Sequence, residues 1–414
     1  MSNKVVVIGA GAAGLMAAGS ASALGADVLL LEKNQKEGRK IAITGKGRCN
    51  LTNNCDVQTF IRNVPTNGKF LYSAINNFTP YDAVEFFEDR GLKTKTERGN
   101  RVFPLSDRAL DVVDTMRDYA LENGAEIIND TAVALIIKDG EIKGVKTENG
   151  KYDCDCAIVC CGGVSYPLTG STGDGYLLAK QAGHTVTEIK PSLVPLESDD
   201  KCCKDMRGLS LRNISLKIKN KDSGKVLYDD FGELLFTHFG LSGPTILSAS
   251  SHIKNTDVKN LLAVIDLKPA LSEEQLDARI LRDFSENINR DVSNSFTKLL
   301  PKKIVPTVLI RWGVPFNKKC NVITKEERQK LVKILKEFTV SISGFRPVDE
   351  AIVTSGGVKT SEINPKTMES KLCKGLYFAG EVIDVDAYTG GFNLQIAWST
   401  GKLSGENSAY GKDE

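Results

Sequence analysis

A short run of small residues near the start of the chain has the spacing that lets a backbone approach the phosphates of a dinucleotide. The run reads Gly-Ala-Gly-Ala-Ala-Gly from Gly9 to Gly14, after the apolar residues 5–8 and before a segment rich in alanine. Glycine permits a tight turn from strand to helix, and the helix start stabilises the negative charge of a pyrophosphate. We expect a strand, a turn and a helix here, with the phosphates contacted by Gly9, Gly11, Ala12, Ala13 and Gly14.

The acidic residue Glu32 has the position that such a nucleotide site needs. It lies 18 residues after Gly14, at the end of a second apolar run, residues 28–31. A carboxylate at this place accepts hydrogen bonds from ribose hydroxyls, and its charge disfavours the 2′-phosphate of NADP. We expect Glu32 and its neighbour Lys33 to bind the nucleotide. A glycine-rich turn without a ligand is the alternative, and the pattern does not distinguish NAD from FAD.

Two further segments, one after the second apolar run and one near the end of the chain, favour FAD. Residues 38–50 read GRKIAITGKGRCN, and residues 375–381 form an apolar strand that ends in Ala-Gly-Glu. A turn with the pair Gly390 and Gly391 follows and opens a helix. This arrangement resembles the second FAD fingerprint of flavoproteins with the two-dinucleotide fold. Reduced flavin has negative charge near N1, which the amides and the dipole of a helix start stabilise.

Together these segments resemble a family of bacterial flavoproteins that includes aminoacetone oxidase and the bile-acid-inducible flavoprotein reductase. The resemblance covers nearly the whole chain, through the motifs TGKGRCNLTN, CCGGVSYPLTGSTGDGY, GELLFTHFGLSGP, TSGGV and FAGEVIDVDAYTGGFNLQIAWSTG. It implies an α/β fold with a glutathione-reductase-like FAD domain, which has a Rossmann core and a β-meander, and an inserted α+β domain. It also implies FAD as the cofactor, with NAD(P)H as a transient co-substrate.

The resemblance assigns FAD contacts to several segments. Val133 is expected to meet the adenine through its backbone. Residues 159–163 read Val-Cys-Cys-Gly-Gly where the family has Ala-Thr-Gly-Gly, so the side-chain hydrogen bond of the family is not carried over to Cys161. The full expected set in these segments is Arg39, Lys40, Thr44, Gly45, Gly47, Arg48, Cys49, Asn50, Val133, Cys161, Gly162, Gly163, Gly380, Glu381, Gly390, Gly391, Phe392 and Asn393.

Five residues are candidates for catalysis at the flavin. Arg48 and Cys49 belong to the loop expected beside N5, where they can orient a substrate, tune the flavin or only make structural contacts. Asp386 and Tyr388 precede the Gly-Gly turn, with simple loop packing as the alternative. His238, in the motif THFGLSGP, can move a proton, although a structural hydrogen bond is the more common role. None of the three histidines has a neighbour at metal-ligand spacing, and we expect no metal.

The elements that must position these residues come from both ends of the chain. We expect residues 1–190 and 346–414 to form the FAD domain. Within it, residues 131–158 are expected to form the β-meander, because the turn signals Lys-Asp-Gly and Glu-Asn-Gly break that stretch into short strands.

A segment of roughly the size of a domain separates the two parts of the FAD domain. Residues 191–345 are expected to form a substrate or cover domain, β-rich over about 191–268 and helical over about 269–340. Capping-box patterns beginning at Ser272 and Thr324 predict two helix starts in its later part. An insertion of this size is explained more easily as an active-site cover that excludes water than as part of a flavin-holding sensor.

The composition limits the kinds of binding partner and the cellular compartment that we expect for this chain. Lys and Arg (54) nearly balance Asp and Glu (52), so no strong field of one sign is expected to hold nucleic acid. No apolar run is long enough to span a bilayer, and no membrane partner is expected. Ten cysteines without a CxxC pair exclude a dithiol centre and are typical of a reducing cytoplasm. We expect a cytoplasmic protein with a small-molecule substrate, and the sequence leaves its oligomeric state open.

Two reactions fit this family resemblance. In the first, NAD(P)H reduces the flavin, which then reduces an activated C=C bond in a small organic, steroid-like substrate by hydride transfer through N5. In the second, an amine of the aminoacetone type reduces the flavin, and O2 reoxidises it with release of H2O2. We favour the first, since the absence of a second GxGxxG after a strand is consistent with transient NAD(P)H binding. A non-catalytic flavin-binding protein or an RNA-modifying flavoprotein is the less favoured alternative.

Overall fold

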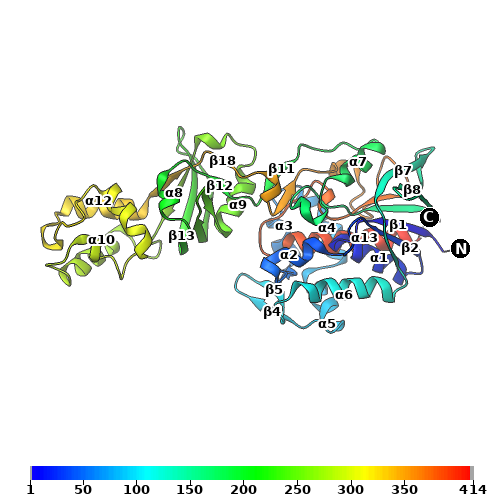
Figure 1. The fold of residues 1–414 in the computed structure, drawn as a ribbon, viewed down its shortest axis with the longest axis horizontal. Helices are drawn as coiled ribbons and strands as arrows, with labels where there is room; N and C mark the ends of the chain where they lie inside the picture. Colours follow the sequence, from blue (N-terminus) through cyan, green and yellow to red (C-terminus); the bar gives the residue numbers. More distant parts are fainter. Residues whose placement is uncertain (1, 411–414) are drawn as a thin grey trace. The chain divides into compact units, whose positions relative to one another are not determined.

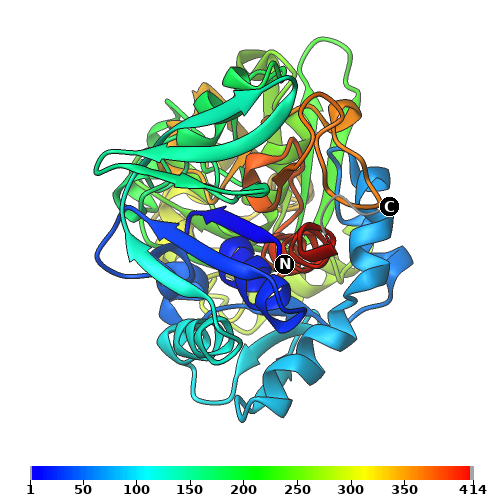
Figure 2. The same ribbon diagram turned by 90° about the vertical axis from the view of Figure 1, so that its right-hand side faces the viewer.

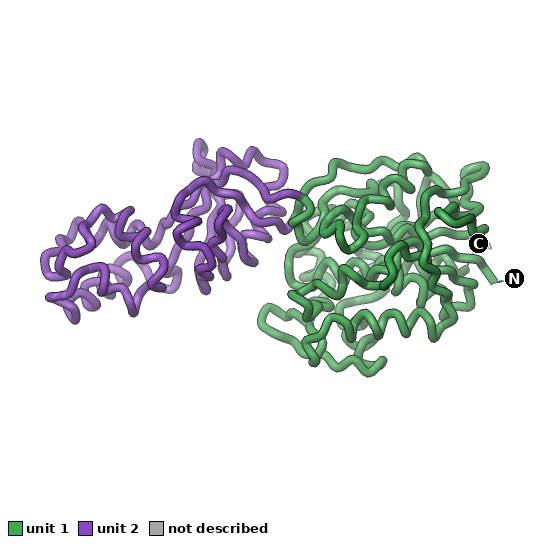
Figure 3. The backbone as a smooth tube through the Cα atoms, in the orientation of Figure 1, with its two compact units in different colours: residues 1–192, 348–414 green, residues 193–347 purple. Residues whose placement is uncertain are grey.

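The computed structural model describes residues 2–410 of the chain. The chain divides into two compact units (Figure 3). Unit 1 consists of Met1–Ser192 together with Val348–Glu414, and unit 2 consists of Leu193–Pro347. The junctions lie two residues C-terminal to those expected from the sequence. Unit 1 is therefore discontinuous in sequence, and unit 2 is continuous.

A five-stranded parallel sheet forms the centre of unit 1, and it confirms the α/β class. Its strands are rich in Val, Ile and Leu, which suits a sheet that is covered on both faces. The strand order is β20-β10-β1-β2-β6. In chain order the strands are β1 (Lys4–Ile8), β2 (Asp27–Glu32), β6 (Glu126–Asn129), β10 (Cys156–Val159) and β20 (Leu376–Phe378).

Two helices from opposite ends of the chain pack side by side against this sheet, α1 (Ala12–Ala23) and α13 (Phe392–Tyr410) (Figure 1, Figure 2). A Cβ atom on Gly401 would lie only 2.5 Å from the carbonyl oxygen of Ala13. One turn further along, a Cβ on Gly405 would overlap the carbonyl oxygen of Ala17. Glycine at both positions therefore lets the two backbones touch, and the matching order of the contacts shows that the helices run parallel.

The remaining elements of unit 1 surround this core. A small sheet is formed by β3 (Thr52–Asn53), β4 (Thr94–Glu97) and β5 (Arg101–Pro104), and a strand pair by β11 (Lys190–Ser192) and β19 (Val353–Ser355). The further α-helices are α2 (Arg39–Gly47), α3 (Val57–Arg62), α4 (Tyr72–Asn77), α5 (Pro80–Asp89), α6 (Ala109–Glu122) and α7 (Asp174–Gln181).

The predicted β-meander is present, but it is shorter than expected. It contains β7 (Ala132–Lys138), β8 (Glu141–Thr147) and β9 (Lys151–Asp153). Asp139 and Gly140 both have positive φ, as a tight hairpin turn requires. The expectation that the meander extends to residue 158 is wrong, because the fully buried strand β10 pairs with β1 in the parallel sheet.

Unit 2 has one core that joins a seven-stranded antiparallel sheet to helices. The strand order is β17-β16-β13-β14-β15-β12-β18. The strands are β12 (Leu196–Glu197), β13 (Ser210–Asn220), β14 (Val226–Phe236), β15 (Gly240–Ser242), β16 (Leu261–Asp266), β17 (Phe338–Ser341) and β18 (Gly344–Phe345). The α-helices are α8 (Lys201–Asp205), α9 (Pro244–Ile253), α10 (Glu273–Ser285), α11 (Val305–Trp312) and α12 (Lys325–Lys336).

Both predicted capping boxes are confirmed. The side chain of Ser272 accepts a hydrogen bond from the backbone of Gln275 at the start of α10, and Thr324 does the same with Glu327 at the start of α12. In each case the partner side chain bonds back to the backbone of the cap residue. Across residues 2–410, none of the helices combines the length and the apolar character needed to cross a bilayer.

Candidate functional site

Four parallel strands of unit 1 end at one edge of the sheet, and the predicted cofactor segments lie there. Residues 9–14 follow β1, and Glu32 is the last residue of β2. Residues 160–163 follow β10, and residues 379–381 follow β20. In open α/β sheets, ligands bind beyond the carboxyl ends of the strands. The sheet therefore brings together four segments that are far apart in sequence.

The first glycine-rich turn is tightly packed on one side and open on another. Gly9 has a φ of +100°, and a Cβ there would come within 3.0 Å of the carbonyl oxygen of Cys160. A Cβ on Gly14 would overlap the carbonyl oxygen of Gly9. By contrast, a Cβ on Gly11 would meet nothing within 4 Å, and α1 begins directly afterwards without a side-chain cap. The turn thus offers unoccupied backbone N–H groups at a helix start, which suit an anion.

Glu32 joins this turn to the end of β2. Its buried carboxylate accepts hydrogen bonds from the backbone N–H of Ala10 at 2.9 Å and from the backbone N–H of Asn34 at 2.8 Å. The Asn34 side chain also donates to it at 2.6 Å, and Arg39 donates to Asn34 at 2.7 Å. A carboxylate has about four acceptor positions, so capacity remains for a ribose hydroxyl.

Lys33 points to a different group of side chains. Its ammonium lies 2.5 Å from both the hydroxyl of Thr172 and the carboxylate of Asp174. Asp174 opens α7, so the ion pair fixes the end of β2 to that helix start. The structure therefore gives Lys33 a positioning contact on the protein side of the predicted nucleotide site.

The start of α13 is built from the predicted Gly-Gly turn. A Cβ on Gly391 would overlap the backbone of Thr52, and the side chain of Asn53 donates to the carbonyl oxygen of Gly390 at 3.0 Å. The side chain of Asn393 bonds the backbone of Ala387 in both directions, at 3.0 and 2.8 Å, which closes the preceding loop. These contacts leave the first N–H groups of α13 as the polar groups of the turn available to a ligand.

The starts of α1 and α13 are offset along a common direction. Gly401, which touches Ala13 at the start of α1, lies nine residues after Phe392, the first residue of α13. At about 1.5 Å per helical residue, the start of α13 lies roughly 14 Å beyond that of α1. Two parallel helix starts separated in this way suit an extended cofactor such as FAD, which has a pyrophosphate in its middle and an electron-accepting ring at one end.

A polar cluster surrounds Glu381, and the preceding Gly380 lies against Ala13 at the start of α1. The carboxylate of Glu381 is 2.5 Å from the ammonium of Lys40 and accepts a hydrogen bond from the backbone N–H of Thr354 at 2.8 Å. Ser165 donates to Glu381 at 3.1 Å and accepts from Lys40 at 2.6 Å. Gly380, the preceding residue, donates its N–H to Thr400 at 2.9 Å. Sequence reasoning missed Ser165 and Thr354 as members of this cluster, although both lie in the motifs GGVSYP and TSGGV.

The loop that follows α2 has an unusual backbone and one unsatisfied group. Lys46 and Cys49 are non-glycine residues with φ near +60°, and Gly45 and Gly47 are also in the left-handed region. The side-chain oxygen of Asn50 is buried and has no hydrogen-bond partner among residues 2–410. Buried polar atoms are nearly always paired, so this atom fits a partner supplied by a ligand. The N3–H edge of an isoalloxazine is a partner of the required kind.

The side chain of Arg48 is held by the protein. It forms ion pairs with Glu97 at 2.5 Å and with Asp107 at 2.6 Å, and it stacks 4.2 Å from the centre of the Phe103 ring. The hydrogen bond to Glu97, followed by that to Asp107, raises the pKa of Arg48 and keeps it charged. This anchoring makes Arg48 a fixed positive charge beside the loop. Within the same loop, the hydroxyl of Thr44 donates to the carbonyl oxygen of Ile41 at 2.7 Å.

Two of the five catalytic candidates have side chains in the interior of unit 1, contrary to expectation. Cys49 is wholly buried, and burial raises the pKa of its thiol to about 12. Asp386 is also wholly buried and accepts hydrogen bonds from Ser192 at 2.6 Å and from Ser355 at 3.0 Å. Neither side chain reaches a surface that a substrate can contact. Their positions indicate packing and hydrogen-bonding roles instead.

Apart from Arg48, the remaining two candidates differ in location. Tyr388 is half-buried in unit 1, just before α13, and its backbone N–H donates to Asn63. Burial, with a smaller contribution from Asp386, raises the pKa of Tyr388 to about 12, so its hydroxyl stays protonated at neutral pH. His238 is exposed in unit 2, between β14 and β15, with its ring against Phe239.

The segment after β10 and the predicted adenine contact have backbones shaped for close approach. Gly162 has positive φ, and a Cβ on Gly163 would overlap the side chain of Thr354. Cys161 points its thiol toward the carbonyl oxygen of Ile8 at 3.6 Å. Val133 falls at a register shift between β7 and β8, which leaves its backbone outside the ladder. Across residues 2–410, no three His, Cys, Asp or Glu side chains are grouped closely enough to bind a metal.

Comparison with known proteins agrees with this architecture. Residues 3–407 match the family model described as HI0933-like protein Rossmann domain. The chain is 30% identical over 416 residues to the 3-dehydro-bile acid delta(4,6)-reductase of Clostridium scindens, covering 98% of this chain and 99% of the relative. It is also 30% identical over 398 residues to the ribosomal RNA dihydrouridine synthase of Escherichia coli, covering 95% of each chain.

A solved structure shows that the fold extends beyond these relatives. The 3-ketosteroid delta1-dehydrogenase of Sterolibacterium denitrificans is similar over 99% of this chain and 100% of that one, with a TM-score of 0.53 and 11% sequence identity. At that identity the likeness concerns the fold alone. The family match over nearly the full length, together with the two helix starts at one sheet edge, identifies the chain as a member of the HI0933-like family of Rossmann-fold flavoproteins, and thus as an FAD-dependent oxidoreductase.

Proposed function

We propose that this protein reduces a carbon–carbon double bond conjugated to a carbonyl group in a small organic substrate, with NAD(P)H as the reductant. The observation that supports this most is the shared chemistry of relatives matched over at least 95% of this chain. A delta(4,6)-reductase of a 3-dehydro bile acid acts on double bonds conjugated to a ketone. Dihydrouridine is uridine whose C5–C6 double bond, conjugated to a carbonyl, has been reduced. Both reactions add hydride to a polarised double bond, which an amine oxidase does not do.

When bound, FAD would contribute the hydride-transfer chemistry, and residues of unit 1 would hold it. The chain's own groups then have two tasks in this proposal. The first N–H groups of α13 would hold an electron-accepting part of the cofactor and would stabilise negative charge there, as helix starts do for anions. Tyr388, which is protonated at neutral pH, donates the proton that completes saturation of the double bond.

The test is an anaerobic two-step reaction of the FAD-loaded protein. NADH or NADPH should bleach the flavin absorbance, and a 3-oxo steroid with a conjugated 4,6-diene should restore it, with reduction of one of its two C=C bonds for each reduced flavin that is reoxidised. A Tyr388→Phe variant should bleach at the normal rate and be reoxidised at least about tenfold more slowly. If neither nicotinamide bleaches the flavin while aminoacetone yields H2O2 in air, the protein is an amine oxidase and the proposal is wrong.

A second candidate substrate, a uridine in ribosomal RNA, is favoured by the distribution of charge. Leu193–Pro347 contains 26 Lys and Arg against 19 Asp and Glu, whereas the rest of the chain contains 28 against 33. The overall balance thus conceals a basic unit 2 and an acidic unit 1, and basic surfaces attract the phosphates of RNA. Incubation with ribosomal RNA from cells that lack this protein tests the point. Appearance of dihydrouridine, without turnover of the steroid, would transfer the proposed reaction to RNA.

A further inference from the structure

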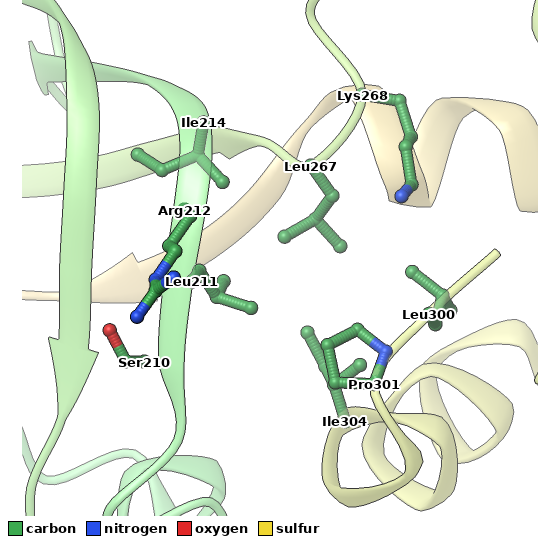
Figure 4. A pocket seen from close by; sticks show the side chains of 9 residues that line it. All are labelled: Ser210, Leu211, Arg212, Ile214, Leu267, Lys268, Leu300, Pro301 and Ile304. Carbon is green, nitrogen blue, oxygen red and sulfur yellow. The ribbon is translucent and has the colours of Figure 1, made fainter.

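Unit 2 contains a cavity of about 280 Å³ between the start of β13 and the segment that leads into α11 (Figure 4). The five Leu and Ile side chains that line it are no more than 7% exposed. Its two cations, Arg212 and Lys268, lie on opposite sides of it, and Arg212 is exposed to solvent. The cavity therefore does not direct two charged groups at one point. Hydrogen bonds that do meet at one point lie in unit 1, at the start of α13.

The short strand β3 of unit 1 supports the first turn of α13. The hydroxyl of Thr52 donates to the side-chain oxygen of Gln395 at 2.7 Å, and both groups are buried. A Cβ on Gly391 would overlap the backbone of Thr52. Asn53, the second residue of the strand, is only 5% exposed. Both residues of β3 are therefore enclosed beside the helix start.

Asn53 makes the contact closest to the Gly-Gly turn. Its side-chain amide donates to the carbonyl oxygen of Gly390 at 3.0 Å and to the carbonyl oxygen of Gly99 at 3.0 Å. Gly99 belongs to the turn between β4 and β5. Since both partners are acceptors, the NH2 group must face them, and its two N–H groups are both used. One buried side chain thus connects the hairpin turn to the Gly-Gly turn.

The bond from Asn53 to Gly390 sets the direction of a backbone donor. A peptide group is planar, so the N–H of Gly391 points away from the carbonyl oxygen of Gly390. Gly390 and Gly391 have φ values of +129° and +100°, and glycine alone would leave this peptide several orientations. Within residues 2–410 the N–H of Gly391 donates no hydrogen bond. Asn53 therefore fixes an unused N–H group at the start of α13.

We propose that Asn53 is a positioning residue that raises the reduction potential of bound FAD by holding the Gly391 N–H as a donor to the cofactor. Reduced flavin has more negative charge than oxidised flavin, and a fixed N–H at a helix start stabilises that charge. Without Asn53 the Gly390 carbonyl oxygen is unpaired, and its partial negative charge opposes the same effect. The role of Asn53 rests on the flavin placement in the proposed function, but it is independent of the substrate.

The test is the reduction potential of the FAD-loaded protein, measured by equilibration with a reference dye in the absence of any substrate. Asn53→Leu has a similar size and cannot donate. We expect its preference for reduced over oxidised flavin to fall about three- to tenfold, which is about 15–30 mV for a two-electron couple. Asn53→Ser, whose side chain is too short to reach both carbonyl oxygens, should show the same fall and serves if the leucine variant does not fold.

Two control variants separate positioning from a general loss of packing. Thr52→Val removes the bond to Gln395 from the same strand, so it should lower the free energy of unfolding and leave the potential unchanged. Asn54→Leu changes the next residue, whose side chain is exposed, and should alter neither property. Urea unfolding of the same preparations measures the stability of each variant.

Three results overturn the proposal. They are an unchanged potential in both Asn53 variants, an equal fall in Thr52→Val, and loss of FAD from both Asn53 variants, which would assign the residue to cofactor retention instead. Failure of the proposed function has a different signature, namely that neither nicotinamide bleaches the flavin. The dye measurement needs no nicotinamide and no substrate, so the two failures can be distinguished.

Discussion

The ammonium of Lys40 lies 2.5 Å from the carboxylate of Glu381, although 340 residues separate the two in sequence. Both side chains are about one-fifth to one-quarter exposed, and Ser165 bonds to both. The pair thereby fixes α2 to the loop after β20, at the edge of the sheet where the cofactor segments meet. Because these segments come from opposite ends of the chain, the pair is a direct link between the two halves of the proposed FAD site.

Replacing Lys40 should weaken FAD binding. In Lys40→Met, Glu381 loses its opposite charge, and we expect an FAD dissociation constant at least about tenfold larger, equivalent to about 1.4 kcal/mol. The double variant with Glu381→Gln should lose less than the sum of the two single variants, because the residues act on each other. Flavin fluorescence on titration measures both effects. Lys151→Met, which removes one partner of an exposed ion pair, is the control. An equal loss of FAD affinity in Lys40→Met and Lys151→Met would contradict the prediction.

Glu32 should affect both stability and cofactor retention. Glu32→Ala removes the acceptor for Ala10 and Asn34, and we expect a loss of about 1–3 kcal/mol in the free energy of unfolding together with faster FAD release. Glu32→Gln keeps one acceptor oxygen. Its free energy of unfolding and its rate of FAD release should therefore lie between those of the unchanged protein and those of Glu32→Ala. Urea unfolding and gel filtration with absorbance at flavin wavelengths provide the measurements. An alanine variant that retains FAD normally would remove the role proposed for this carboxylate.

The contact between α1 and α13 should tolerate no side chain at Gly401. A methyl group there would lie 2.5 Å from the carbonyl oxygen of Ala13, so Gly401→Ala must push the helices apart at a cost of about 1–3 kcal/mol. Thermal unfolding should begin at lower temperature, and the purified protein should contain less FAD. Gly150→Ala, at a position with open space, should change neither property. A stable, fully yellow Gly401→Ala protein would show that the backbones are not in contact.

His184 should make stability depend on pH. Burial lowers its pKa, although the Glu362 carboxylate at 3.2 Å opposes the shift. Between this lowered pKa and the value of about 6.5 in the unfolded chain, the unfolded state binds more protons. The stabilisation is therefore fully present above about pH 6.5 and is lost as the pH falls. As the pH is lowered across this interval, the urea concentration at the midpoint of unfolding should fall less steeply for His184→Gln than for the unchanged protein. Parallel curves for the two proteins would count against the prediction.

Much of the architecture could be predicted from local patterns. The runs of Val, Ile and Leu at the starts of β1 and β2 require burial on both faces, and only a parallel α/β sheet provides it. The capping boxes at Ser272 and Thr324 depend on contacts within four residues, so the sequence contains all the information that they need. The family resemblance and the FAD-dependent activity are confirmed by the matches over nearly the whole chain.

The parts that could not be predicted depend on distant contacts. Ser165 and Glu381 follow β10 and β20, which end at the same sheet edge, whereas Thr354 comes from β19 in a separate strand pair. The three residues meet only in the folded chain, and no local pattern contains that information. Cys49 has a positive φ and a wholly buried side chain, in a loop where sequence alone permits either direction. The basic character of unit 2 does not appear in the total charge of the chain, because the acidic excess of unit 1 balances it, and the boundaries of the units are known only from the fold.

The backbone contact between Ala13 and Gly401 also sets an order of events during synthesis on the ribosome. All of unit 2 leaves the exit tunnel before α13 does, so unit 2 can fold as a contiguous body. At that stage α1 and the glycine-rich turn before it do not yet have α13 as a packing partner. During that interval β10 has no β20 beside it, and its open edge is exposed to pairing with other chains. A premature stop codon shortly before Leu376, which removes both β20 and α13, should therefore yield an aggregating product with an intact unit 2, rather than an enzyme that merely lacks its last elements.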